Sequence, residues 1–193
     1  MYNSKIRSFT LVDSYNAKTQ FEDSIKKEID SKTKEYILSI DENEYKEFIL
    51  KDFSLEPLII NIESERIDKP LVKKEQVSSF PRDYLYETDV YFFTARYSFS
   101  GSSVLFKIRP SSWIMTSYDI SVSESTNEVS FTFKVIEQSP DKFFEEKKRA
   151  FNAAFANIVN VNSFANEWNK NLKEIVNRLF DQTKNKFLKY TSL

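Results

Sequence analysis

Hydrophobic residues recur every three or four positions near both ends of the chain, which is the pattern of helices with one buried face. Residues 15–40 show this spacing and predict a first helix, with lysines and glutamates on the opposite face. A second helix is predicted to begin at Asp41, because aspartate caps helices and Glu44 follows three residues later. Pro57 marks the end of this helical segment, since proline cannot continue a helix.

The centre of the chain instead alternates hydrophobic and polar residues, which predicts strands with one buried face. The predicted strands are 58–62, 91–99, 104–109, 118–122 and 129–135. We expect 91–99 and 104–109 to form an antiparallel hairpin around Gly101. Residues 63–87 are charged and contain two prolines, so they are interpreted as a loop or extended connector.

A third helix is predicted to begin at Ser139, where a capping serine is followed by Pro140 and an early acidic residue. The helical spacing breaks at Asn160 to Asn162, and Ser163 is expected to cap a last helix. Two long helices with a short break predict a helical hairpin.

The last predicted helix carries a stripe of large apolar residues at heptad-like spacing. Its members are Trp168, Leu172, Ile175 and Leu179. We interpret the stripe as core, and a surface for a partner or a second copy is the alternative.

These elements predict an α+β fold, in which an antiparallel sheet of about four or five strands packs on one face against two N-terminal helices and a C-terminal helical hairpin. A length of 193 residues fits a single domain, 1–193. Within it, 1–56 would hold the N-terminal helices, 57–139 the sheet and 140–193 the helical hairpin.

The amino-acid composition excludes several classes of catalytic and metal-binding site. There is no histidine and no cysteine, which excludes disulfides, thiolate nucleophiles, Cys/His zinc sites and a Ser-His-Asp triad. Gly101 is the single glycine, and a phosphate-binding loop or dinucleotide motif needs at least two. Lysine and arginine number 28 and aspartate and glutamate 29, so the whole chain lacks a basic footprint for nucleic acid.

A candidate binding corner follows the predicted strand 104–109. Arg109 ends the strand, Pro110 fixes the backbone, and Ser111, Ser112 and Trp113 add two hydroxyl groups and a ring. Arg109 could pair with a buried carboxylate and thereby fasten the strands to the helices. Alternatively, it could hold a phosphate or carboxylate ligand. We favour the structural role.

Residues 140–193 hold ten lysines and arginines against six acidic residues. Their cations suggest a basic edge for phosphate or an acidic partner, formed by Lys147, Lys148, Arg149, Lys184 and Lys186. The competing interpretation, which we favour, is that the interspersed acids neutralise these charges over a short distance.

Carboxylate pairs are the candidates for a metal site. They are Glu63 with Glu65, Asp83 with Glu87 and Asp89, and Asp141 with Glu146 and Lys148. The last set matches a nuclease-like pattern but falls on one predicted helix instead of a strand, so we attribute it to chance. Solvated surface positions explain the other pairs better, and we expect no metal and no cofactor.

The segment Phe99-Ser-Gly101-Ser-Ser-Val-Leu-Phe-Lys-Ile-Arg109-Pro110-Ser111 resembles the signature of a family of uncharacterised bacterial proteins. Similarity to the family extends from about residue 40, through Tyr45 and Pro57, to Trp168. The family's Asp-Pro pair is replaced here by Ser102 and Ser103. The resemblance implies a domain N-terminal to a variable domain and an association with antiphage defence. It implies no catalytic residues.

We therefore expect a non-catalytic interaction or sensing domain of a bacterial, defence-associated system. A protein partner or self-association is expected, with nucleic acid as a weaker alternative. No membrane span or export segment is predicted, so the expected location is cytoplasmic. The alternatives are a metal-dependent nuclease or phosphohydrolase that uses carboxylates, and a homo-oligomeric scaffold joined through the helical hairpin.

Overall fold

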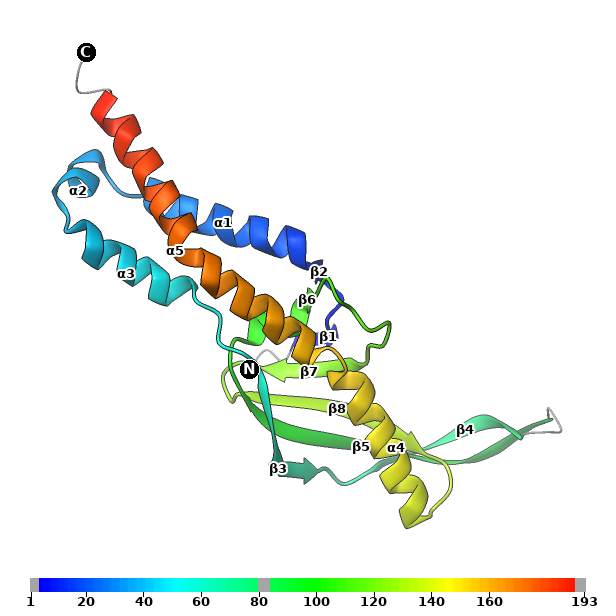
Figure 1. The fold of residues 1–193 in the computed structure, drawn as a ribbon. Coiled ribbons are helices and arrows are strands. Elements are labelled where there is room, and N and C mark those ends of the chain that lie inside the picture. The colour runs from blue at the N-terminus through cyan, green and yellow to red at the C-terminus, as the bar shows by residue number, and fades with distance from the viewer. Residues whose placement is uncertain (1–3, 80–83, 190–193) are drawn as a thin grey trace.

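The computed structural model describes residues 4–79 and 84–189 as an α+β protein (Figure 1). Its helices are α1 (Ser14–Asp30), α2 (Lys34–Ser39), α3 (Glu42–Phe53), the 3-10 helix η1 (Ser103–Lys107), α4 (Pro140–Phe155) and α5 (Ile158–Lys189). Its strands are β1 (Ser4–Arg7), β2 (Val12–Asp13), β3 (Ile59–Ile67), β4 (Leu71–Ser79), β5 (Tyr84–Ser100), β6 (Ile108–Arg109), β7 (Asp119–Ser123) and β8 (Glu128–Val135). None of the described helices is long and apolar enough to cross a membrane.

Six strands form one antiparallel sheet in the order β1-β7-β8-β5-β3, with β4 paired to the other half of β5. The α+β class and the antiparallel sheet are therefore confirmed. Strand β1 pairs with β7 and was not predicted from the sequence. At four residues it is too short to show an alternation.

Helix α4 covers one face of the sheet, because alternate residues of β5 and β8 supply aromatic rings to it. The Phe143 ring lies 4.9 Å from that of Phe93, and the Phe151 ring lies 5.3 Å from that of Tyr97. The opposite side chains of these strands, such as Thr94 and Lys134, form what we call the open face. The sheet is thus covered on one face as expected, but α4 provides this cover, whereas the N-terminal helices expected there pack against α5.

Helix α5 continues beyond the sheet and packs against α1, α2 and α3 (Figure 1). The apolar stripe of α5 is core, as favoured from the sequence: Trp168 is 1% exposed, and its indole Nε1 donates a hydrogen bond to the Phe53 carbonyl at 2.8 Å. Leu172 and Leu179 are also buried.

Asparagine side chains at the start of α5 bind the backbone of segments that carry no regular structure. The Asn162 amide accepts from the Leu58 N–H at 2.7 Å and donates to the Leu58 carbonyl at 2.9 Å. Asn169 binds the N–H and carbonyl of Leu55 in the same way, at 2.8 and 2.7 Å. The connection from α3 to β3 is thereby fixed along α5 without a strand partner.

The predicted hairpin of 91–99 with 104–109 is wrong. At Gly101, whose φ is +100°, the chain turns away, and a Cβ there would collide with the Pro57 carbonyl oxygen. Helix η1 follows and buries both Leu105 and Phe106, which a strand with one core face cannot do for adjacent residues. The short β6 then pairs in parallel with β2.

The predicted helix 15–40 is divided in two. Helix α1 ends at Asp30, and α2 begins after Thr33, whose hydroxyl accepts a hydrogen bond from the Tyr36 N–H. Asp41 caps α3 as predicted, with its carboxylate accepting from the backbone N–H groups of Asn43 and Glu44. Threonine is a preferred helix-capping residue, so Thr33 within the predicted helix 15–40 indicates the start of a new helix. The prediction of one continuous helix did not take it into account.

The predicted connector 63–87 is largely strand. It contains the end of β3, all of β4 and the start of β5, and only 80–83 lie outside the described residues. We call β4 with residues 84–90 the β4–β5 arm, which projects from the sheet (Figure 1). Its two strands pair mainly with each other, and this explains why no hydrophobic alternation marks them in the sequence.

The predicted C-terminal helical hairpin is also wrong. The break lies at Ala156 and Asn157, and α5 continues the line of α4 instead of folding back (Figure 1). Asn160 to Asn162 lie within α5, and the Ser163 hydroxyl donates to the Val159 carbonyl of the same helix. Asn162, predicted to lie in a break of the helix, instead binds the backbone of Leu58.

Replacing Asn162 with alanine is expected to lower the free energy of unfolding by about 2–3 kcal/mol, because the backbone N–H and carbonyl of buried Leu58 lose their partner. Urea unfolding measures the effect. Asn166→Ala, an exposed position one turn further along α5, is the control and should change stability by less than about 0.5 kcal/mol. Equal losses in both variants would contradict the role given to Asn162.

Candidate functional site

The predicted binding corner lies where β6 meets the start of α1. Arg109 is exposed, and its guanidinium carbon lies 5.9 Å from the centre of the Trp113 ring. The Ser111 and Ser14 hydroxyls are 2.9 Å apart, which joins the corner to α1. Among the described residues Arg109 forms no ion pair within 4.0 Å, so the buried carboxylate expected for it is not there.

The nearest acidic group that Arg109 influences is the α1 cap. The pKa of Asp13 is held below its usual range, chiefly by a hydrogen bond from the Asn16 N–H, with a smaller contribution from the Arg109 charge. Ser112 is exposed, and the Trp113 indole Nε1 is buried without a partner in the described structure. The corner fastens β6 to α1 through Ser111, and its use as an anion site stays a prediction.

The cations of the predicted basic edge do not form one surface. Lys147, Lys148 and Arg149 lie on α4, whereas Lys184 and Lys186 lie near the far end of α5 (Figure 1). Three of them also have acidic partners: Lys147 with Glu65, Arg149 with Glu146 and Lys184 with Glu42. The two helices extend in line, and this separates the residues that a hairpin would have brought together.

The candidate carboxylates do not converge either. No group of three or more acidic side chains suited to a metal ion occurs in 4–79 or 84–189. Glu87 lies 3.5 Å from Lys74, and Glu146 pairs with Arg149. Asp83 lies outside the described residues.

Glu65 instead joins the sheet to α4. It receives hydrogen bonds from the Tyr97 hydroxyl at 2.5 Å and from the Lys147 ammonium at 2.7 and 2.9 Å. Burial opposes ionisation of Glu65, but these two donors outweigh it and hold the pKa of Glu65 below its usual range. Burial and the nearby Glu65 charge raise the pKa of Tyr97, so the cluster keeps a neutral tyrosine beside an ion pair.

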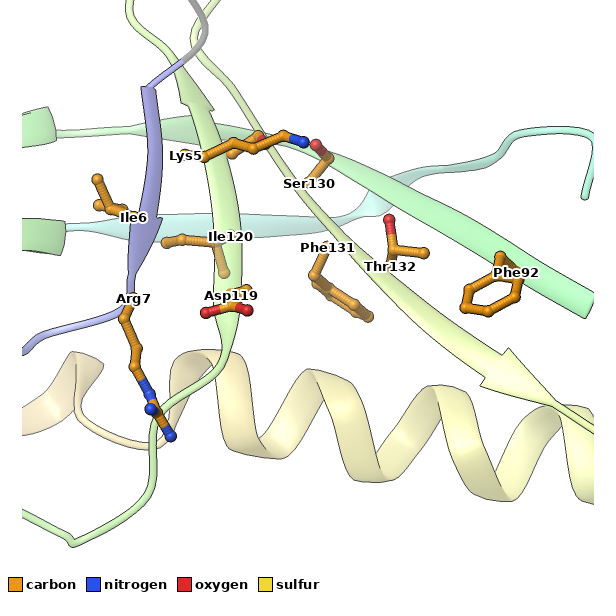
Figure 2. Close-up of a pocket in the computed structure, with 10 residues that line it drawn as sticks. Lys5, Ile6, Arg7, Phe92, Asp119, Ile120, Ser130, Phe131 and Thr132 are labelled. Carbon is orange, nitrogen blue, oxygen red and sulfur yellow. The ribbon is translucent and has the colours of Figure 1, made fainter. Parts of the chain in front are cut away.

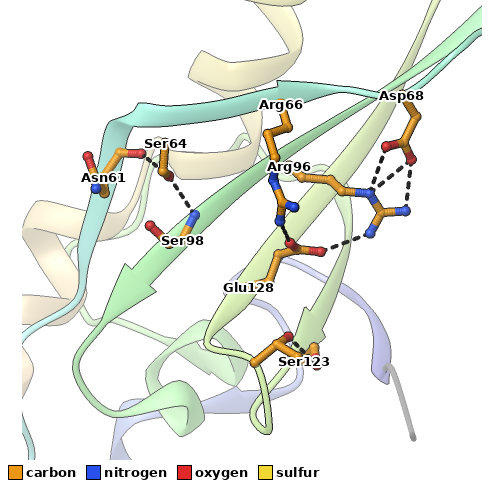
Figure 3. A network of polar contacts seen from close by, with 9 residues as sticks. Asn61, Ser64, Arg66, Asp68, Arg96, Ser98, Ser123 and Glu128 are labelled. Carbon is orange, nitrogen blue, oxygen red and sulfur yellow. Dashed lines mark hydrogen bonds and ion pairs between the residues drawn. The ribbon is translucent and has the colours of Figure 1, made fainter.

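A second charged network lies on the open face (Figure 3). The Arg96 guanidinium binds both oxygens of Asp68 at 2.8–3.0 Å and reaches Glu128 at 2.9 Å, while Arg66 also pairs with Glu128. The Arg96 hydrogen bond lowers the pKa of Asp68. The charge of Arg96 is thus neutralised by Asp68 and Glu128, so Arg96 is not a free cation for a ligand.

The remaining part of the open face is hollowed. A cavity of about 570 Å³ lies between β1 and β5. Phe92 lies at its end away from β1 (Figure 2). Lys5 and Arg7 project from β1, and hydroxyl groups come from Ser121, Ser130 and Thr132. None of these residues was proposed as a site from the sequence. Their common face is set by the sheet register, in which Lys5 pairs with Ser121 and Ser121 with Ser130.

Searches of protein-family models, of curated proteins and of solved structures find no match to this chain. The resemblance carried by Phe99 to Ser111 therefore stays a prediction. Within that segment the structure shows Gly101 as the turn and Arg109 as the exposed end of β6.

The Glu65 cluster is expected to make stability depend on pH. The folded-state pKa of Glu65 is lowered, so its contribution is complete above about pH 5 and is lost as the pH falls through the folded pKa. Glu65→Gln should lower the free energy of unfolding by about 1–3 kcal/mol at pH 7. The difference in the free energy of unfolding between wild type and Glu65→Gln, measured by urea unfolding, should decrease toward zero as the pH is lowered to about 3.

Glu63→Gln is the matched control, because Glu63 is exposed two residues away on the same strand. It should leave stability at pH 7 nearly unchanged. A gap between wild type and Glu65→Gln that stays constant down to pH 3 would show that the ionised carboxylate is not the source of the stabilisation.

Proposed function

We propose that this chain is a non-catalytic interaction domain that self-associates through the β4–β5 arm. The observation that carries the proposal is the apolar surface of the arm. Leu71 is 58% exposed, Tyr84 is 55% and Leu85 is 64%, and the ring of Tyr84 lies 6.0 Å from that of Tyr86. Leu71 and Tyr84 lie on one face at opposite ends of the arm, and Leu85 lies on the other face. Large apolar side chains exposed on a projecting element favour a partner that covers them.

The arm also presents unpaired backbone. Strand β8 pairs with β5 only from Tyr91 onward, so residues 84–90 pair with β4 alone among the described strands. A two-stranded ribbon is marginally stable in water, and its free edges are templates for another strand. Binding of a further strand along β4 would satisfy one of these edges and shield the apolar side chains.

The charge pattern of β4 favours a second copy as the partner. Antiparallel pairing about a two-fold axis at Lys74 would place each Lys73 opposite Glu75 of the second chain, and each Leu71 opposite Val77. The axis also brings Lys74 against its own copy, but Glu87 of the same chain lies 3.5 Å from each Lys74 and offsets this repulsion. Two opposite-charge pairs and two apolar pairs then support the dimer.

The resemblance described above extends the proposal to a bacterial cytoplasm and to an antiphage system. In that setting the dimer would bring together the variable domains that follow in such proteins. Support for this extension comes from the Phe99 to Ser111 segment alone.

Charge reversal tests the register. Lys73→Glu and Glu75→Lys should each weaken self-association by about tenfold or more, because each converts two attractive cross-strand pairs into two repulsive ones. The double variant Lys73→Glu/Glu75→Lys should associate like wild type. A mixture of the two single variants should form heterodimers. Sedimentation velocity across a concentration series measures all four samples.

Lys170→Glu, an exposed position on α5, controls for charge alone and should associate like wild type. Circular dichroism should show every variant folded. A wild-type chain that stays monomeric at its highest soluble concentration contradicts the proposal, and so does a double variant that stays as weak as the single ones.

A further inference from the structure

Three hollows adjoin one another, from the open face near β1, past the edge of β8 that β7 leaves unpaired after Phe131, to the side of α4. The cavity of Figure 2 shares Phe92 and Thr132 with a second hollow of about 240 Å³. The second shares Lys134, Glu146 and Arg149 with a third, of about 560 Å³, which reaches Tyr86 on the arm. We call the three together the open-face groove. It is a long shallow track that runs from β1 to the arm.

The groove is more basic than the chain as a whole. Five cations line it, namely Lys5, Arg7, Lys134, Lys142 and Arg149, against three acids, Asp119, Glu137 and Glu146. Lys134 pairs with Glu75, Lys142 with Glu145 and Arg149 with Glu146, so the cations at the β1 end carry most of the uncompensated charge. In the described structure no carboxylate lies within 4.0 Å of the Lys5 or Arg7 side chains. The Arg7 guanidinium donates to the neutral Ser117 hydroxyl at 2.8 Å, and Asp119 is its neighbour across the strand pair.

Aromatic rings occur along the same track. Phe92 is half-buried on the open face, with the Lys73 ammonium 5.5 Å from its ring centre. Tyr118 lines the second hollow, and Tyr86 lines the third. Hydroxyl groups of Ser121, Ser130 and Thr132 lie between the cations and the rings.

We infer that the open-face groove binds single-stranded nucleic acid. Cations that follow a groove bind successive phosphates, and rings on an uncovered sheet face stack on unpaired bases. Lys5 and Arg7 are placed for phosphates at one end of the track, and Lys134 lies further along it, beside Phe92. A shallow groove that holds cations and rings together suits an unpaired strand better than a duplex, whose bases are not available for stacking.

Fluorescence anisotropy with labelled oligothymidylate and oligouridylate tests the inference. The triple variant Lys5→Ala/Arg7→Ala/Lys134→Ala should bind at least tenfold more weakly at low salt. The slope of log affinity against log salt concentration should become shallower by about 2, since each phosphate that is no longer neutralised lowers it by about 0.7. Phe92→Leu should weaken binding about tenfold and leave the salt slope unchanged, because it removes a stacking ring and no charge.

The matched control is Lys170→Ala/Lys173→Ala/Lys186→Ala, which removes three exposed cations from α5, away from the groove. It should bind like wild type. The inference is overturned by any of four results: no binding of either single strand at low salt, equal affinity for a duplex, an equal loss in the control, or full affinity in Phe92→Leu. Lys73 contacts the Phe92 ring and Glu75 pairs with Lys134, so the arm variants are not used to measure nucleic-acid binding. Lys5→Ala/Arg7→Ala, which changes only β1, should self-associate like wild type, so the two activities can fail separately.

Discussion

Asparagine amides on α5 hold the irregular segments of this protein in place, and most of the remaining fold depends on them. An amide side chain can satisfy one backbone N–H and one carbonyl at once, as a neighbouring strand would. Asn162 and Asn169 do this for Leu58 and Leu55, and Asn157 does it for Ile114 at the junction of α4 and α5. One straight pair of helices thereby fixes both the path into β3 and the loop after β6.

The second constraint is the unequal chemistry of the two sheet faces. Rings of Phe93, Tyr97, Phe131 and Phe133 require cover, and α4 supplies it with Phe143 and Phe151. On the other face, hydroxyl and charged groups are stable in water, so no second layer of helices is needed. The first hollow of the groove follows from this asymmetry, since side chains of β1, β7 and β8 are left to form its floor, while α4 lines the other two.

The sequence predicts the elements with strong local patterns and misses those decided by distant contacts. Asp41, Pro140 and the alternation of β8 mark elements that the structure confirms. The turn at Gly101 is visible, but the direction of the chain after it depends on Pro57, which no local pattern reveals. The asparagines at 160–162 resemble a helix break in the sequence, because the segment that Asn162 binds lies about a hundred residues away. The candidate site was missed for the same reason: Lys5, Ser121 and Ser130 become neighbours only through the sheet register.

The two proposed activities are compatible in their geometry. Antiparallel pairing of two β4 edges relates the copies by a two-fold axis perpendicular to the sheet, so both open faces would lie on the same side. The groove reaches Tyr86 of β5, and β4 lies between this strand and the axis. Internal ion pairs such as Arg96 with Asp68 and Arg149 with Glu146 carry no net charge into the groove, so its potential is set mainly by Lys5 and Arg7.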